Sequence, residues 1–169
     1  AKARPQLPAL QGVHHTDVAI IGGGYTGLSA ALHLAKAGRE CVVLEAEDIG
    51  YGGAGRNAGL VNAGLWLMPE EMLKLAGGEY GEKLLALLGN SPDLVYCLIE
   101  EHQIECEPLR NATLHCADSK AGLKALQQRE AQWQQRGAPV RLLDPEETAA
   151  RTGSQSFYGA LMDERAGTI

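Results

Sequence analysis

The sequence predicts an α/β protein organised around a Rossmann-like βαβ unit near its N-terminus. An apolar run over residues 17–21 is typical of a strand, and a second apolar run over 41–44 ends on an acid. Between them, a glycine turn leads into an amphipathic stretch over 25–37, which indicates a helix. A strand, a helix and a strand in this order favour two parallel strands joined by a right-handed crossover.

The first apolar run is nearly continuous, as is typical of a parallel strand that is covered on both faces. The helix is expected to turn one apolar stripe towards this strand. The stripe consists of Leu28, Ala31, Leu32 and Ala35.

The glycines of the first turn have the spacing of a dinucleotide-binding motif. Gly22, Gly24 and Gly27 form G-x-G-x-x-G between the strand and the helix. Gly22 permits the tight turn, Gly24 leaves room for a pyrophosphate, and Gly27 lets the helix pack closely on the strand. The free N–H groups and the positive dipole end of the helix then face the phosphates.

Glu45 follows the second strand, 18 residues after Gly27. Its carboxylate is placed to accept hydrogen bonds from ribose hydroxyls, and its charge would repel a 2′-phosphate, which argues against NADP. The motif serves FAD and NAD alike. On these residues alone both cofactors stay open, beside a glycine turn that binds no ligand.

A second glycine-rich stretch follows the βαβ unit. Five glycines occur between positions 50 and 59, together with Arg56 and Asn57. Such a backbone can approach a phosphate or a flat ring closely and line it with N–H groups. The alternative is a flexible linker, but Leu60 and Val61 follow the stretch, whereas linkers are rich in small polar and charged residues.

Composition and charge exclude several classes of function. The chain has 15 basic and 21 acidic residues and a net charge of −6, which gives no electrostatic case for nucleic acid or an anionic membrane. The four cysteines show no C-x-x-C pair and no zinc-ligand spacing with histidine, so we expect reduced thiols and neither a disulfide nor a metal site. With no secretory signal and no long apolar span, we expect a cytoplasmic protein.

The remainder of the chain is predicted to alternate between helices and short strands. Residues 69–102 are expected to be helical, with Ser91-Pro92-Asp93 starting a third helix there and Trp66, Met68 and Met72 in the core. The later elements are a strand over 113–117, a helix capped by Asp118-Ser119 that ends at Gly137, a short strand at 142–143, a capping box at 144–147 and a last strand over 157–162. The lone histidines His102 and His115 have no partner at a useful spacing, so we expect no catalytic role for either.

Three segments of the chain together carry a more specific resemblance. They are Leu7-Pro-Ala-Leu10, residues 22–31, and residues 53–59, which read Gly-Ala-Gly-Arg-Asn-Ala-Gly. Together they resemble the D-amino-acid oxidase superfamily of FAD-dependent oxidoreductases, and in particular its gamma-glutamylputrescine oxidase-like branch. The third motif usually reads Ser-Gly-Arg-Asn-Gly-Gly in that branch. Ala54 and Ala58 depart from this pattern, so one hydroxyl near the phosphates is lost and one methyl group is added near the flavin.

The resemblance implies FAD rather than NAD. It implies pyrophosphate over Gly22 to Gly27, the adenosine ribose on Glu45, and the flavin side against Arg56 through Leu60. The candidate cofactor-binding residues are Gly22, Gly24, Tyr25, Thr26, Gly27, Glu45, Ala46, Gly53, Ala54, Gly55, Arg56, Asn57, Ala58, Gly59 and Leu60.

The sequence pattern and the resemblance together give the expected domain organisation, with the leader and the helical segment taken from the pattern and the two family domains from the resemblance. An extended leader over 1–15 precedes the first part of an FAD-binding domain over 16–67. A helical segment over 68–104 leads into residues 105–169, the beginning of an α+β substrate domain built on a mostly antiparallel sheet flanked by helices.

The activity implied by the resemblance is oxidation of an amine or an amino acid, with hydride transfer to flavin N5 and reoxidation by dioxygen. No catalytic residue is assigned, because the family's substrate pocket lies largely later in the chain. We expect an N-terminal fragment that needs the remainder of its own chain or a complementary subunit, and that alone neither holds FAD tightly nor oxidises amines. The alternatives are a non-catalytic FAD-binding subunit of a hetero-oligomeric oxidase and an NAD-binding module.

Overall fold

The computed structural model describes residues 7–169. Two compact units can be distinguished in it, a first unit that ends at residue 58 and a second unit over residues 59–169. Residues 1–6 of the predicted leader lie outside the described part of the chain. The rest of the leader, residues 7–15, is exposed and forms no helix or strand.

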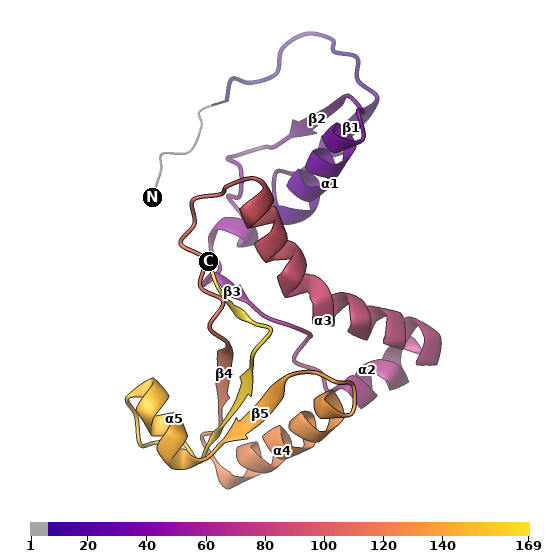
Figure 1. The fold of residues 1–169 in the computed structure, drawn as a ribbon. Coiled ribbons are helices and arrows are strands. Elements are labelled where there is room, and N and C mark those ends of the chain that lie inside the picture. Colours follow the sequence, from indigo (N-terminus) through magenta and orange to yellow (C-terminus); the bar gives the residue numbers. More distant parts are fainter. Residues whose placement is uncertain (1–6) are drawn as a thin grey trace. The chain divides into compact units, whose positions relative to one another are not determined.

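The first unit contains the predicted βαβ arrangement. Strand β1 (Val18–Ile21) is followed by helix α1 (Tyr25–Lys36) and strand β2 (Cys41–Leu44). The two strands pair in parallel, in a register that sets Val18 beside Cys41 and Ile21 beside Leu44 (Figure 1). The prediction of this unit is confirmed.

Helix α1 approaches the sheet at Gly27 rather than along the predicted apolar stripe. A Cβ atom at position 27 would overlap the carbonyl oxygen of Gly22 and lie 3.3 Å from Cγ2 of Ile20. Because the closest approach is centred on a glycine, the helix is rotated, and Leu28, which was expected to face the strand, is 38% exposed. The predicted stripe is therefore wrong in part.

Strand β1 is covered on one face only, which corrects the expectation of a strand buried on both sides. Val18 and Ile20 are half-buried, whereas Ala19 is exposed and Ile21 is 90% exposed. Among the described residues β1 pairs with β2 alone, and the α-helix of the unit, α1, packs against this pair.

The second unit is built on an antiparallel sheet of three strands in the order β4-β6-β5. Its strands are β4 (Thr113–Cys116), β5 (Val140–Leu143) and β6 (Ala160–Asp163), and β6 is the central strand, buried over its first three residues. Helix α4 (Lys120–Gln134) packs along β5 and β6, where Leu126 and Trp133 join the main apolar core (Figure 1). The predicted last strand over 157–162 begins three residues later than expected.

A second, two-stranded sheet was not predicted. Strand β3 (Leu60–Val61) pairs antiparallel with β7 (Gly167–Thr168), which follows β6. Gly167 packs tightly there, because a Cβ atom at this position would overlap the Leu109 carbonyl oxygen and the Tyr96 hydroxyl.

The helical segment holds two helices rather than three. They are α2 (Pro69–Ala76) and α3 (Gly78–Glu101), and α3 continues through Pro92, which is buried inside it. Pro92 has no N–H to donate to the carbonyl of Leu88, one helical turn earlier. That carbonyl instead accepts hydrogen bonds from the Gly64 N–H, at 3.1 Å, and from the Ser91 hydroxyl, at 2.9 Å. The predicted helix start at Ser91 is therefore wrong.

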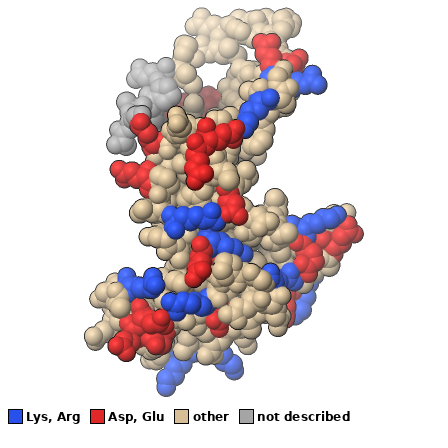
Figure 2. Space-filling view, viewed as in Figure 1, with Lys and Arg blue, Asp and Glu red and all other residues tan. Residues whose placement is uncertain are grey.

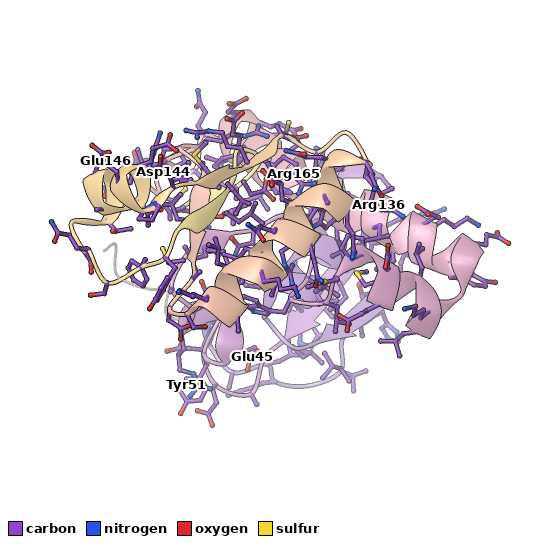
Figure 3. All side chains as sticks on the ribbon, turned by 90° about the horizontal axis from the view of Figure 1, so that it is seen from below. Glu45, Tyr51, Arg136, Asp144, Glu146 and Arg165 are labelled. Atoms are coloured by element: carbon purple, nitrogen blue, oxygen red, sulfur yellow. The ribbon has the colours of Figure 1, made fainter. Side chains whose placement is uncertain are left out.

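Two predicted helix starts after residue 117 are confirmed. The Ser119 side chain accepts a hydrogen bond from the N–H of Gly122 at the start of α4. Asp144 and Glu147 form a reciprocal capping box at the start of α5 (Pro145–Thr152). In Figure 3 this helix is found by the labels of Asp144 and Glu146. Such boxes satisfy the first backbone donors of a helix.

The core prediction for residues 66–72 holds in one of its three positions. Met72 is 2% exposed and belongs to the main core, whereas Met68 is half-buried. Trp66 is 78% exposed, because its loop places the ring edge-on against His115, with ring centroids 4.7 Å apart, outside the core.

Candidate functional site

The glycine turn after β1 is held by backbone hydrogen bonds on both sides. The Gly22 N–H donates to the Leu44 carbonyl across 2.7 Å, and the Gly23 carbonyl accepts from the Gly50 N–H at 2.9 Å. Gly22 has a φ of 103°, a conformation that side chains rarely adopt. The turn is therefore tied to β2 and to the second glycine-rich stretch.

The N-terminus of α1 presents donors that no protein group uses. Within residues 7–169, the backbone N–H groups of Gly24, Tyr25, Thr26 and Gly27 donate to no other described residue, as expected for the first turn of a helix. No atom lies within 4 Å of the position that a Cβ atom would take at Gly24. This turn thus offers open space beside free donors at the positive end of the helix dipole.

Glu45 lies against the same turn. Its Oε2 accepts a hydrogen bond from the Gly23 N–H at 2.6 Å, and its Oε1 accepts one from the Glu47 N–H at 3.2 Å. The Gly23 N–H, followed by that of Glu47, holds the pKa of the Glu45 carboxyl below its ordinary value. The side chain is exposed, and each oxygen keeps a further lone pair for a ligand hydroxyl (Figure 3). Ala46 is the next residue and is also exposed.

The second glycine-rich stretch forms a short turn of 3-10 helix, η1 (Gly53–Gly55). Arg56 follows it, donates from Nε to the Gly52 carbonyl at 3.2 Å, and sets its guanidinium 5.9 Å from the centre of the Tyr51 ring. Asn57 donates to the hydroxyl of Tyr25 across 2.7 Å. The stretch is thereby fastened to the N-terminus of α1.

Within the first unit, the structure brings the predicted residues of both glycine-rich segments together through Asn57 and Tyr25. Ala58 ends this unit, and Gly59 and Leu60 begin the second. There the Gly59 carbonyl accepts from the Ile169 N–H at 3.0 Å.

Sequence reasoning missed Gly23. It is the middle residue of the turn and not a motif glycine, yet its N–H and carbonyl hold Glu45 and Gly50. The pairing of Asn57 with Tyr25 was missed as well. The sequence indicated this contact only indirectly, because both glycine-rich segments were expected to bind the same ligand.

Residues 17–169 match the protein family described as FAD dependent oxidoreductase, DAO. The chain belongs to this family. The resemblance seen in the motifs is thereby confirmed, and FAD is the cofactor of the DAO family.

Two proteins with similar sequences are longer than this chain. Probable oxidoreductase OrdL of Rhizobium meliloti is 34% identical over 98% of this chain and 39% of its own length. Gamma-glutamylputrescine oxidoreductase of Escherichia coli is 34% identical over 90% of this chain and 36% of its own length. The chain thus spans less than half the length of these relatives.

The fold also matches a solved structure. Glycine oxidase from Geobacillus kaustophilus superimposes with a TM-score of 0.72 over 93% of this chain and 41% of that one, at 23% identity. At this identity the match concerns the fold alone. It confirms the α/β class.

The residues of the first unit fit a DAO-family cofactor. Open space at Gly24 leaves room for a pyrophosphate, and the free N–H groups around it are suitable donors. Glu45 stands beside this turn, and its carboxylate oxygens are hydrogen-bond acceptors of the kind that a ribose hydroxyl needs. No catalytic side chain is assigned.

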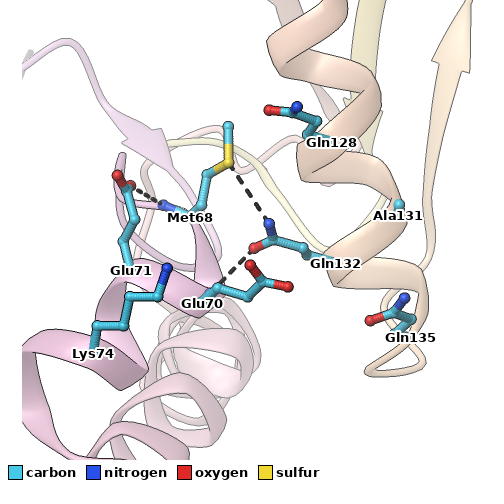
Figure 4. A pocket seen from close by; sticks show the side chains of 8 residues that line it. All are labelled: Met68, Glu70, Glu71, Lys74, Gln128, Ala131, Gln132 and Gln135. Atoms are coloured by element: carbon cyan, nitrogen blue, oxygen red, sulfur yellow. Dashed lines mark hydrogen bonds between the residues drawn. The ribbon is translucent and has the colours of Figure 1, made fainter.

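A cleft of about 400 Å³ lies elsewhere, between α2 and α4 (Figure 4). None of its lining residues is a predicted site residue. Gln132 crosses it, accepting from the Glu70 N–H at 3.1 Å and donating towards the Met68 sulfur at 3.8 Å. This polar lining joins two helices and shows no group set up for catalysis.

His115, on β4, is half-buried. Burial, and then the charge of Arg129, lower the pKa of its imidazole. Arg129 itself donates to the Leu65 carbonyl at 3.0 Å and to the Trp66 carbonyl. These contacts fix the loop that carries Trp66, and they give His115 a structural setting rather than a reactive partner.

Other classes of site are not seen in the described part of the chain. Among residues 7–169, no three His, Cys, Asp or Glu side chains are grouped to hold a metal ion. Cys41, Cys97, Cys106 and Cys116 are all unpaired. No helix over this range has the length and apolarity that crossing a membrane requires.

Proposed function

We propose that this chain supplies the nucleotide-binding part of an FAD-dependent oxidase of amines or amino acids. The observation that carries the proposal is the joint geometry of the first unit. Free N–H groups surround an open Gly24 at the start of α1, and the Glu45 carboxylate is fixed beside the same turn. Membership of the DAO family supports the choice of FAD.

Each part of this geometry has one role in the proposal. The first turn of α1, from Gly24 to Gly27, holds the pyrophosphate. Glu45 accepts hydrogen bonds from the adenosine ribose, next to Ala46, and disfavours a 2′-phosphate. The segment from Gly53 to Leu60 serves the flavin side, with Arg56 as its cation.

The substrate class is argued from the relatives. One is a gamma-glutamylputrescine oxidoreductase, and a protein of similar fold is a glycine oxidase. Both names point to oxidation at a carbon that bears nitrogen. When bound, FAD supplies hydride acceptance at N5 and reoxidation by dioxygen. The described residues of this chain would bind and orient the cofactor, and the groups that hold the amine belong to further polypeptide in this proposal.

Titrations of the purified chain test the cofactor: flavin fluorescence reports the binding of FAD, and the affinities of NAD and NADP are measured from their displacement of FAD. FAD is expected to bind more tightly than NAD, and NADP more weakly than either. Glu45→Gln is the matched variant, and it should narrow the difference between NAD and NADP because it removes the charge that repels a 2′-phosphate. NAD binding as tight as that of FAD would overturn the proposal, as would NADP binding equal to that of NAD.

The activity is tested by peroxide release. We expect the 169-residue chain to lose FAD on gel filtration and to release no peroxide from amines. A yellow, monomeric chain that forms peroxide from an amine would contradict the division of the site between this chain and further polypeptide.

A second candidate is a non-catalytic FAD-binding subunit of a hetero-oligomeric oxidase. It is favoured by β1, whose outer edge has no partner among the described residues and whose Ile21 is 90% exposed. An open apolar strand edge invites pairing with another strand. A co-purifying protein that carries strands for this edge would favour the subunit.

Two further points belong to the proposal. Lys and Arg side chains are interspersed with Asp and Glu on the face shown in Figure 2, and the net charge is −6, so we propose no nucleic-acid partner. Four unpaired thiols suit a reducing compartment, and we propose the cytoplasm.

A further inference from the structure

The side chains of Tyr25 and Asn57 join the two glycine-rich segments of the first unit. Tyr25 is the first residue of α1, and Asn57 follows η1. The Asn57 amide nitrogen lies 2.7 Å from the Tyr25 hydroxyl oxygen. One hydrogen bond thus couples residues 32 positions apart.

The direction of this bond follows from the other neighbours of the same nitrogen. It lies 2.7 Å from the Ala54 carbonyl oxygen and 3.4 Å from that of Gly53. Carbonyl oxygens only accept, so the atom facing them must be the NH₂ group of Asn57 and not its amide oxygen. Asn57 is therefore the donor, and the Tyr25 hydroxyl oxygen is the acceptor.

The Tyr25 hydroxyl keeps its own proton for another acceptor. A hydroxyl group has one donor besides its acceptor lone pairs. Among residues 7–169 no group accepts a hydrogen bond from Tyr25, and the residue is 62% exposed. Accepting a bond from Asn57 polarises the O–H group, which strengthens it as a donor.

The surroundings of this hydroxyl favour a negatively charged acceptor. Tyr25 directly follows Gly24, which borders open space, and the free N–H groups of the first turn lie at the same helix end. The helix dipole favours an anion there. Arg56 adds a cation on the loop that holds Asn57.

We propose that Tyr25 donates a hydrogen bond to the pyrophosphate of the bound dinucleotide, and that Asn57 is the positioning residue that orients this hydroxyl. The inference rests on the proposed function, since it requires a dinucleotide at this turn. It gives the second glycine-rich stretch a part in phosphate binding, which reaches the ligand through Tyr25.

The test compares two ligands that differ in their phosphates. The ¹⁵N-labelled chain is titrated with ADP and, separately, with adenosine, and the amide shifts of the first unit give both affinities. Tyr25→Phe should weaken ADP binding about tenfold, the size of one hydrogen bond to a charged group. Adenosine binding should stay within about twofold, because the ring of residue 25 is retained. Tyr80→Phe, on α3 in the second unit, is the matched control and should change neither affinity.

The role of Asn57 is tested by coupling. Asn57→Ala leaves the Tyr25 hydroxyl without its donor and should weaken ADP binding while sparing adenosine. In the double variant the loss should exceed that of Tyr25→Phe alone by less than about twofold, since one interaction has been removed twice. Amide spectra and thermal unfolding check that each variant is folded. If Asn57→Ala unfolds the chain, the Tyr25→Phe comparison decides the proposal by itself.

The outcomes separate this inference from the proposed function. A wild-type chain that binds neither ADP nor FAD would overturn both. A wild-type chain that binds ADP, with Tyr25→Phe unchanged, would overturn the inference alone. Equal weakening of ADP and adenosine would show that Tyr25 only supports the fold. Fully additive losses in the double variant would remove Asn57 from its positioning role.

Discussion

The backbone N–H of Gly23 donates to Oε2 of Glu45 across 2.6 Å, so the acid that follows β2 holds the glycine turn that follows β1. A Cβ atom at position 23 would come within 3.2 Å of the same oxygen. The carboxylate is thus part of the turn before any ligand is bound. A residue predicted as a ribose acceptor also shapes the place where the phosphates are expected.

Protonation of Glu45 is expected to release this turn. Hydrogen bonds from Gly23 and Glu47 lower the pKa of the folded carboxyl, so its contribution to stability is present above the unfolded pKa of about 4.3 and is lost as the pH falls through the folded pKa. The amide resonances of Gly23 and Glu47 should therefore shift together in that acidic range. Both shifts should vanish in Glu45→Gln, and their persistence there would assign them to another group.

Alanine substitution at two glycines of the same motif should have different effects, one on stability and the other on ligand affinity. Gly27→Ala places a methyl group on the Gly22 carbonyl and should destabilise the first unit by about 2 kcal/mol, seen in thermal unfolding. Gly24→Ala meets no atom and should leave stability within about 0.5 kcal/mol, yet it fills the space proposed for the pyrophosphate. Titration of the folded Gly24→Ala variant with ADP should therefore show a weaker affinity for ADP than that of the wild type. Unchanged ADP affinity would place the phosphates elsewhere.

Gly167→Ala should destabilise the second unit. The added methyl group would overlap the Leu109 carbonyl and the Tyr96 hydroxyl, so β7 must move away from these two residues at a cost of about 2 kcal/mol. Denaturant unfolding measures this cost. Gly78→Ala, at the open start of α3, is the control, and it should be neutral or stabilising by up to about 1 kcal/mol. Equal changes in unfolding free energy for the two variants would show that the close packing at Gly167 does not contribute to the stability of the second unit.

Acid should weaken the second unit through His115. Burial and the Arg129 charge lower the pKa of the folded imidazole, so its stabilising contribution is present above about pH 6.5 and is lost as the pH falls towards the folded pKa. The melting temperature of the wild type should drop more between pH 7 and pH 5 than that of His115→Gln. Parallel curves would mean that His115 titrates as it does in the unfolded chain.

The elements predicted well from the sequence are those specified by near neighbours. The G-x-G-x-x-G turn of β1 and α1, and the capping box at Asp144 and Glu147, use residues a few positions apart, so their patterns are visible locally. The first of these segments carries Gly22, Gly24, Tyr25, Thr26 and Gly27 of the candidate site.

The elements missed depend on partners far along the chain. Strand β3 has two residues, and Leu60 pairs with Thr168, so no local periodicity announces it. The rotation of α1 follows from the close approach of Gly27 to the Gly22 carbonyl, which outweighs the apolar stripe through Leu28. The hydrogen bond of Asn57 with Tyr25 likewise needs the fold to bring two loops together.

Pro92 has a consequence for the loop that precedes α2 and α3 in the chain. A carbonyl inside a helix is normally used by the helix itself, but the one of Leu88 holds Gly64, at the start of the loop that also carries Trp66. The carbonyl is open to these donors because Pro92 has no N–H to offer it. One imino acid thus makes the middle of a helix a fixed point for a segment that precedes it in the chain.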